Sequence, residues 1–278
     1  MKKIRNSIAV IGMFLLLMTS CSKDVLQYDT SIVKDFEIQL NGEPWSLNTG
    51  ISTKPIFIYN NDGDFFANYS SHYRFALDNG KYKFLATDIP EQMVPSPVNL
   101  NDLIIPQFPS ADQAVKISAA MPYESPFTDV LTMNILARSG VLRLKAKDIV
   151  ADPSYTNIKT YVTVKRSGYK VADETFVQED LTVSRTKKTT SGGINYTDDF
   201  ILFQTDAEAN NVSIRIEFMT DDLVVVKTKE ISGSFPILAN GVTQISSNLN
   251  DADTPIIENY EVLINGVAPT AKQINQIK

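Results

Sequence analysis

Apolar and polar residues alternate with a period of two along much of this chain. The clearest run covers residues 212–218, where Val, Ile, Ile and Phe alternate with Ser, Arg and Glu. Similar runs occur at 36–40, 82–86, 131–137 and 158–164. Because successive side chains of a strand point to opposite faces, this pattern predicts strands with one face on a hydrophobic core.

Turn sequences separate these runs. Asn-Gly or Gly-Gly pairs stand at 41–42, 79–80, 192–193 and 240–241, and an Asp-Gly pair stands at 62–63. Such pairs are typical of tight hairpins, and no amphipathic helix longer than three turns is evident. Short strands with regular turns predict an all-β fold of antiparallel β-sandwich architecture.

Two breaks indicate how the chain is divided into domains. Five prolines lie between residues 89 and 112, which predicts a long connection that crosses between sheets or follows a sheet edge. The break at 151–154 indicates a domain boundary, because strand patterns resume on each side of it. The expected units are a tether at 21–34, an N-terminal β-sandwich at 35–150, a C-terminal β-sandwich at 155–250, and a final strand and tail at 251–278.

Residues 1–20 have the features of a secretion signal. Three basic residues within the first five precede an apolar run at 8–18, and small residues lead to Cys21, the only cysteine. The run is too short for a membrane-spanning helix. A cysteine at this point resembles the lipobox of bacterial lipoproteins, in which the thiol receives a diacylglycerol; the alternative is an ordinary signal peptide with an incidental cysteine. Ser22 resembles the next residue of outer-membrane lipoproteins, so we expect a lipid anchor in that membrane and a chain that faces the exterior.

The charge balance narrows the choice of partners. The chain has a formal net charge of −6 and no basic stripe, which argues against nucleic acid and against electrostatic binding to anionic lipid. With one cysteine, no intrachain disulfide can form. The chain also has one histidine, His72, so zinc and copper sites are disfavoured and no cofactor is expected.

Candidate catalytic groups are sparse. His72 directly follows a serine, and adjacent residues of a strand point to opposite faces, so the two are not predicted to form a catalytic dyad. The carboxylate pairs Asp198-Asp199 and Asp221-Asp222 are candidates for a glycosidase, but both are expected to lie at strand ends as solvated turns. We therefore predict that the chain is not an enzyme.

Two further features concern ligands. Residues 60–64 place oxygen-bearing side chains at alternating positions, as in a calcium loop, but the distal glutamate of an EF-hand is missing and a hairpin turn is the preferred interpretation. Trp45, the only tryptophan, lies near a turn and is a candidate for stacking on a carbohydrate, with a partly buried packing role as the competing interpretation.

Four segments occur in an order that resembles the fimbrillin superfamily, the lipid-exported fimbrial subunits and anchors of Gram-negative anaerobes. They are a strand with an Asp-Gly hairpin at 54–65, a Gly-Lys-Tyr strand at 77–86, a strand pair at 131–144 and final strands at 230–249. The resemblance implies two transthyretin-like β-sandwich domains and polymerisation with other fimbrial subunits by strand exchange. It also implies that stalk subunits lose their first strand to an Arg-specific protease, whereas anchor subunits keep this strand and their lipid.

Within this resemblance, the positions of the basic residues favour the anchor role. No arginine precedes Arg74 in the mature chain, and Lys34 is the one plausible processing site. The chain is therefore expected to keep the strand that contains Phe36, Ile38 and Leu40, as an anchor or accessory subunit would.

The last strand-like run follows a polar break and has two candidate roles. It could be donated to the groove of a neighbouring fimbrillin, or it could complete the second domain of its own chain, and both remain open. The candidate donor residues are Ile256, Ile257, Tyr260, Val262 and Ile264.

The first functional prediction is a lipid-anchored anchor or accessory subunit of fimbriae in cell adhesion. Its expected partners are the outer membrane, other fimbrial subunits, and host or bacterial surface ligands. The alternative is a glycan-binding surface lipoprotein of a polysaccharide-uptake system, which predicts exposed aromatic rings in a shallow cleft. A glycosidase would need two carboxylates that face one cleft at about 5–10 Å.

Overall fold

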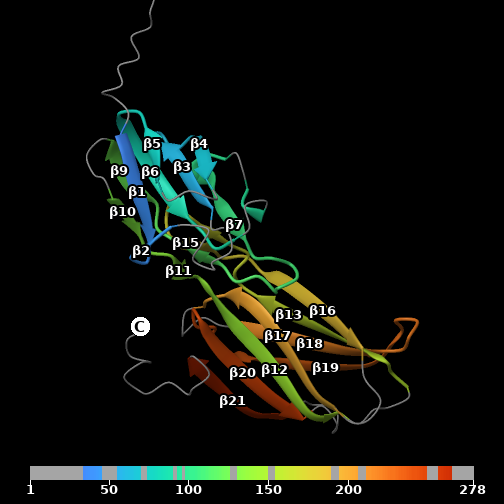
Figure 1. Ribbon diagram of the computed structural model, residues 1–278. Coiled ribbons are helices and arrows are strands. Elements are labelled where there is room, and N and C mark those ends of the chain that lie inside the picture. The colour runs from blue at the N-terminus through green and yellow to red at the C-terminus, as the bar shows by residue number, and fades with distance from the viewer. Residues whose placement is uncertain are drawn as a thin grey trace, which may run out of the picture.

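The computed structural model describes residues 34–45, 55–69, 74–89, 93–95, 98–125, 130–149, 154–188, 194–205, 211–248 and 256–264. Over these residues the fold consists of strands, turns and short 3₁₀ segments, without an α-helix, which confirms the all-β prediction. No helix in this part of the chain has the length and hydropathy needed to cross a membrane. The strands form two groups that lie end to end (Figure 1).

Two four-stranded sheets form the N-terminal group. One has the order β4-β3-β6-β9, and in the other β1 pairs with β10, β2 and β5. Phe36 of β1 and Ile56 and Phe84 of the facing sheet belong to one hydrophobic cluster, so the two sheets share a core. The elements are β1 (Lys34–Leu40), β2 (Glu43–Pro44), β3 (Ile56–Asn60), β4 (Phe65–Tyr69), β5 (Arg74–Leu77), β6 (Gly80–Ala86), η3 (Leu100–Asp102), β7 (Ile104–Pro106), β8 (Lys116–Ile117), β9 (Met121–Ser125), β10 (Val130–Met133) and β11 (Leu136–Ala137).

Two more four-stranded sheets form the C-terminal group, with the orders β17-β12-β20-β21 and β16-β13-β18-β19. The apolar face predicted at 212–218 is confirmed, because its four apolar side chains are at most 2% exposed and belong to the cluster between these sheets. The strands of these two sheets are β12 (Ser139–Ile149), β13 (Asn157–Val164), β16 (Leu181–Lys188), β17 (Ile194–Phe203), β18 (Asn211–Met219), β19 (Val225–Ser234), β20 (Gly241–Asn248) and β21 (Ile256–Ile264). β14 (Gly168–Lys170) and β15 (Thr175–Val177) belong to a separate three-stranded sheet, with the order β15-β14-β7.

Among the described strands two pairs are parallel, which corrects the expectation of purely antiparallel sheets. β1 pairs with β10 in parallel, and β12 pairs with β20 in parallel. Parallel neighbours need a long crossover connection, and here the intervening chain forms other strands. The alternation of side chains has the same period in both kinds of strand, so the sequence pattern does not distinguish them.

β12 lies in the C-terminal group, although it was expected in the N-terminal unit at 35–150. It pairs with β17 from Ser139 to Ile149 and with β20 from Val141 to Lys147. The chain therefore passes between the groups before β12, and the break at 151–154 is the connection from β12 to β13. A turn signal shows that a strand ends but does not show which sheet the strand joins, so the sequence pattern does not assign β12 to its partners.

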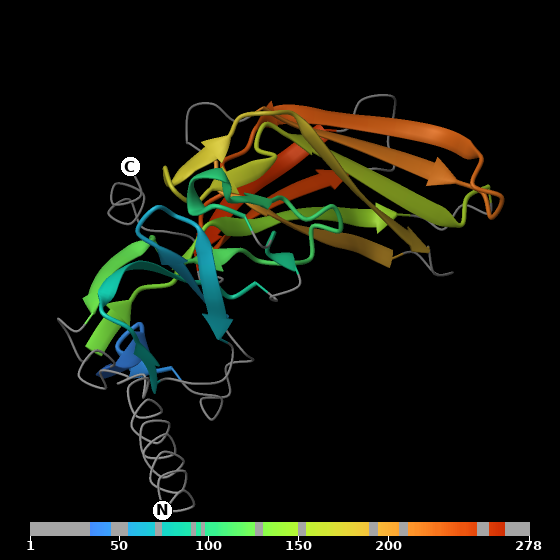
Figure 2. The same ribbon diagram turned by 90° about the horizontal axis from the view of Figure 1, so that it is seen from above.

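A third hydrophobic cluster joins the two groups of strands. Phe57 of β3, Ile105 of β7 and Phe203 of β17 belong to it. β7 lies within the proline-rich connection and pairs with β14 at the edge of the sheet β15-β14-β7, so this part of the connection follows a sheet edge between the two groups of strands (Figure 2). Gly168 allows β7 and β14 to approach closely, because a Cβ there would lie 2.7 Å from Cγ2 of Ile104 and would force that side chain or the strand to shift.

Candidate functional site

β1 is an interior strand of its sheet. It pairs with β10 along one edge and with β5 and β2 along the other. Phe36, Ile38 and Leu40 point into the core, with exposed fractions of 2%, 0% and 8%. The Phe36 ring stacks on Tyr123 with the centroids 4.5 Å apart and meets Phe84 edge-on at 5.4 Å. Removal of β1 would therefore leave an apolar groove between two strand edges.

The Asn-Gly turn after β1 fixes where the strand ends. Asn41 has a φ of 54° and Gly42 a φ of 84°, the left-handed values that a tight hairpin of this type requires. The Asn41 backbone N–H donates to the Met133 carbonyl at 2.9 Å, and its side-chain oxygen accepts from the Ile135 N–H at 2.9 Å. One turn residue thus ties β1 to the end of β10. Lys34, the candidate processing site, pairs with Leu77 in β5 at the start of β1.

β21 contains the five candidate donor residues and pairs with β20 of its own chain. The antiparallel register runs from Ile264 opposite Gly241 to Ile256 opposite Asn248, and places Tyr260 opposite Ile245. β21 is the last strand of its sheet, with β20 as its neighbour. In this structure the strand completes its own sheet. Its donation to another subunit would require it to leave β20, and this possibility remains a prediction.

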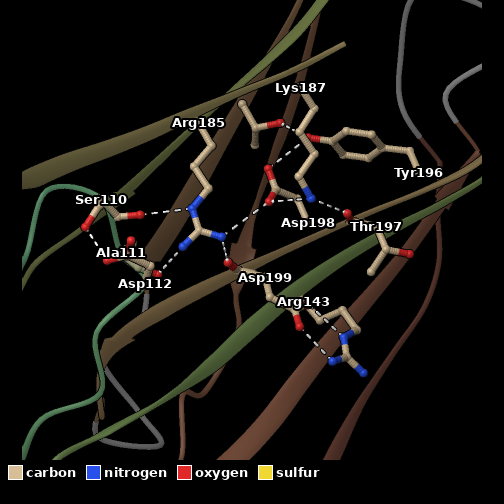
Figure 3. A network of polar contacts seen from close by, with 11 residues as sticks. Ser110, Ala111, Asp112, Arg143, Arg185, Lys187, Tyr196, Thr197, Asp198 and Asp199 are labelled. Atoms are coloured by element: carbon tan, nitrogen blue, oxygen red, sulfur yellow. Dashed lines mark hydrogen bonds and ion pairs between the residues drawn. The ribbon is translucent and has the colours of Figure 1, made fainter. Parts of the chain in front are cut away.

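Asp198 lies in the middle of β17 and is 0% exposed, which is a correction to its expected position in a solvated turn. Figure 3 shows the contacts of its carboxylate. Oδ1 lies 2.9 Å from Nζ of Lys187 and 3.6 Å from Nη1 of Arg185 in ion pairs, and no hydrogen-bond donor in the described structure points at this oxygen. Oδ2 accepts a 3.0 Å hydrogen bond from the Tyr196 hydroxyl. Two cations thus neutralise a carboxylate that lies between the sheets.

The Tyr196 hydroxyl links this carboxylate to the opposite sheet. It lies 2.6 Å from Oγ1 of Thr160 on β13. Burial, and then the negative charge of Asp198, raise the pKa of Tyr196. The hydroxyl therefore stays protonated and serves as a hydrogen-bond donor to the carboxylate.

Asp199 has a different environment from its neighbour. Its carboxylate accepts two hydrogen bonds of 2.7 Å from Nε and Nη2 of Arg143, which lies directly opposite on β12 (Figure 3). The hydrogen bond to Asp199 raises the pKa of Arg143. Because adjacent residues of β17 point to opposite faces, Asp198 and Asp199 cannot flank one scissile bond. This geometry excludes the pair as a glycosidase site.

Arg185 was not identified from the sequence. Its Nε donates to the Ser110 carbonyl at 2.9 Å and its Nη2 donates to the Ala111 carbonyl at 2.6 Å, while Nη1 donates to the Asp199 carbonyl. One side chain on β16 therefore attaches the proline-rich connection to β17. The sequence shows an arginine in an alternating strand, but two of its three acceptors, the Ser110 and Ala111 carbonyls, are more than seventy residues away in the chain.

The remaining polar candidates are turns. The hairpin interpretation of residues 60–64 is confirmed, because this segment joins β3 to β4. The Asp64 carboxylate accepts hydrogen bonds from the side-chain amides of Asn60 at 3.3 Å and Asn99 at 2.9 Å, so it holds the turn against the segment that precedes η3. Asp221 lies in the turn between β18 and β19 and accepts a 2.7 Å hydrogen bond from Thr156. Among the described residues, no group of three His, Cys, Asp or Glu side chains is placed to hold a metal ion.

Trp45 is buried, which corrects its candidate role in stacking on a carbohydrate. Its side chain is 6% exposed and belongs to the cluster that contains Phe36. A sugar would need a free ring face, and this ring is covered by the core. Among the residues whose burial the structure describes, the exposed aromatic side chain is Phe66 on β4, which is 52% exposed and meets the Tyr82 ring at 5.5 Å. Cys21 and His72 lie outside the described residues.

Comparison with known proteins gives similarity of fold. No family model matches the sequence, and no curated protein matches it. Among solved structures, the fimbrial anchor protein Mfa2 from Porphyromonas gingivalis aligns with a TM-score of 0.50 and 7% identity, over 85% of this chain and 98% of its own. A candidate polysaccharide-binding protein from Bacteroides thetaiotaomicron gives 0.50 and 10%, over 86% and 98%. A candidate adhesin from Bacteroides ovatus gives 0.51 and 10%, over 76% and 86%.

These matches extend over both groups of strands. The resemblance to fimbrillins that the sequence motifs indicated is therefore confirmed as a similarity of fold to a fimbrial anchor and to Bacteroides adhesins, at low sequence identity. At this level of identity the similarity establishes the fold alone.

Proposed function

We propose that this chain is a non-enzymatic surface lipoprotein of the fimbrillin type that anchors fimbriae or serves them as an accessory subunit. In this proposal its two groups of strands are transthyretin-like β-sandwich domains. A lipid on Cys21 holds the chain in the outer membrane, so that the domains face the exterior. The observation that carries the proposal is the position of β1, which is an interior strand with three buried apolar side chains.

The packing of β1 supports an anchor rather than a processed stalk subunit. Each buried side chain of Phe36, Ile38 or Leu40 contributes about 1.5–3 kcal/mol relative to an exposed one. Loss of the strand would also leave unpaired backbone groups on β10 and β5, which is costly unless another strand takes its place. A chain that keeps β1 has no vacant groove, and it can end a fibre at the membrane.

The edge position of β21 supports its use as a donated strand. β21 can leave without opening the interior of a sheet, because it pairs with β20 on one side only among the described strands. We propose that it inserts into the groove of the neighbouring subunit, where main-chain hydrogen bonds would provide affinity and alternating side chains would set the register.

Immunogold labelling of intact cells with an antibody against residues 35–250 tests the location. Gold at fibre bases supports the anchor role. Gold along shafts or at tips would retain a fimbrial role but exclude anchoring. A Cys21→Ala strain is the matched control, and it should release the protein from the outer membrane and remove gold from the cell surface.

Strand donation is tested by Tyr260→Asp in β21. If the variant unfolds at the same urea concentration as the wild type but no longer associates with the stalk subunit, donation is supported. If it loses its folded structure instead, β21 serves only its own sheet.

A second candidate function is glycan binding, and the exposed Phe66 ring, which meets the half-buried Tyr82 ring, favours it. A ring that is 52% exposed has a free apolar face, as a sugar-stacking site requires. A glycan array with the full mature chain would detect binding. Phe66→Ala should then abolish the signal, and Leu136→Ala, at a position with the same 52% exposure, should leave it unchanged.

A further inference from the structure

The turn between β18 and β19 and the first two residues of β19 expose four consecutive aliphatic side chains, which we name the apolar tip. Leu223, Val224, Val225 and Val226 have exposed fractions of 62%, 59%, 45% and 46%. Single exposed apolar residues are ordinary on protein surfaces, but contiguous exposed aliphatics at a loop are unusual and typically mark a site of interaction.

The backbone of the apolar tip is strained at Leu223. Leu223 has a φ of 59°, in the left-handed region. This region costs a residue with a Cβ roughly 1–2 kcal/mol, and Gly or Asn would occupy it more easily. A leucine at this position therefore lowers stability while it adds exposed apolar surface. Folding alone does not account for this choice of residue.

Hydrogen bonds hold the tip in one conformation. The Thr220 N–H donates to the Val224 carbonyl at 2.9 Å, and the Leu223 N–H donates to the Thr220 carbonyl at 3.0 Å. The Asn157 side chain also donates to the Thr220 carbonyl, at 3.1 Å. The tip is thus attached to β13 through Asn157, and a partner that binds it would not need to order a flexible loop.

The apolar tip lies at the end of the molecule opposite to β1. Figures 1 and 2 both place the β18–β19 hairpin at the far end of the C-terminal group, away from the N-terminal strands. If Cys21 holds the N-terminal end in the membrane, the tip points away from that membrane. This step rests on the proposed function.

The chemistry of the tip favours a protein as its partner. A lipid surface is disfavoured because Asp221 and Asp222, both exposed, directly precede the tip and would have to approach the bilayer with it. A sugar is disfavoured because aliphatic side chains offer no flat aromatic face. We infer that the apolar tip is the surface that binds the shaft subunit that follows this chain in the fibre. It would insert into an apolar pocket on that subunit.

The test uses a substitution that separates folding from docking. Leu223→Asn relieves the left-handed strain, so it should raise the thermal midpoint while it removes apolar surface. Leu136→Asn is the matched control, with the same change at a residue of 52% exposure in the N-terminal group. The probe is fimbriae sheared from cells that lack this protein, passed over the full-length chain immobilised in detergent.

The expected result is at least a tenfold loss of fimbrial binding for Leu223→Asn and for a second variant, Val224→Thr, with no loss for Leu136→Asn. If the wild type binds and both tip variants bind equally well, the docking inference is wrong and the proposed function stands. If the wild type does not bind fimbriae at all, the proposed function fails, and the inference fails with it. The docking inference would also be wrong if the tip variants kept their binding to fimbriae and instead lost binding to phosphatidylcholine vesicles. The same holds if they instead lost self-association measured by sedimentation.

Discussion

The Lys187 ammonium and the Asp198 carboxylate lie 2.9 Å apart and join β16 to β17 across the C-terminal core. Asp198 is 0% exposed, whereas the Lys187 side chain is 42% exposed. Arg185 and the Tyr196 hydroxyl complete the surroundings of the carboxylate. A buried charge in this position contributes to the pairing of two particular strands, and its removal should be costly.

Asp198→Ala should lower the free energy of unfolding by about 3 kcal/mol, because it leaves Arg185 and the Tyr196 hydroxyl without their common partner. The cost is at the low end for a buried pair, since Lys187 can turn toward water. Urea unfolding followed by circular dichroism measures it. Asp199→Ala is the control and should cost about 1 kcal/mol or less, because its pair with Arg143 is partly exposed. If the two substitutions lowered the free energy of unfolding equally, the burial of Asp198 would not account for its contribution to stability.

Alkaline pH should destabilise the protein through its buried tyrosines. Burial raises the pKa of Tyr59 from 10.0 to about 12, and burial beside Asp198 raises the pKa of Tyr196. Below pH 10 both phenols are protonated in the folded and unfolded states, and the stabilisation is complete. Above pH 10 the unfolded chain loses these protons first, so the free energy of unfolding should fall by about 1.4 kcal/mol per pH unit for each tyrosine.

The measurement is the free energy of unfolding between pH 8 and 12, roughly the range over which a tyrosine with a raised pKa differs between the two states. Tyr59→Phe should make the decline above pH 10 less steep. If the variant and the wild type decline in parallel, the Tyr59 phenol is not protected by burial as the structure indicates.

Gly140→Ala should be strongly destabilising. A Cβ at this position would lie 2.0 Å from the Leu238 carbonyl oxygen, and backbone atoms cannot yield as a flexible side chain can. We expect a loss of at least about 3 kcal/mol, measured as a shift of the urea midpoint. Gly42→Ala is the comparison, because nothing lies within 4 Å of its Cβ. Its φ of 84° alone should cost about 1 kcal/mol.

Phe36→Ala tests whether β1 is a permanent part of the N-terminal core. Loss of this 2% exposed ring removes its contacts with Tyr123 and Phe84 and should cost about 3–5 kcal/mol. Thermal unfolding together with protease sensitivity provides the measurement. Asp35→Ala, at an exposed position of the same strand, should change stability by less than about 0.5 kcal/mol. An unchanged midpoint for Phe36→Ala would mean that β1 contributes little to the fold.

The sequence by itself determined the strand content, several turns and the inward faces. The alternation at 212–218 required one apolar face, because side chains of a strand point alternately to its two sides, and all four apolar residues are buried. The Asn41-Gly42 pair predicted a tight turn because these residues accept left-handed backbone angles, and both have them. These features depend on residues that are close together in the chain, so the sequence alone is enough to predict them.

Only the tertiary structure decided which strands pair and which polar groups are buried. β12 joins the C-terminal sheets because its hydrogen-bond partners, β17 and β20, lie far along the chain, and no local pattern names them. Asp198 is buried because cations of β16 are brought to it from the facing sheet, and Trp45 is buried because a core closes over a ring near a turn. The alternating pattern predicts that a strand has an apolar face. Only the tertiary fold determines which element covers that face and which charged side chains pair there.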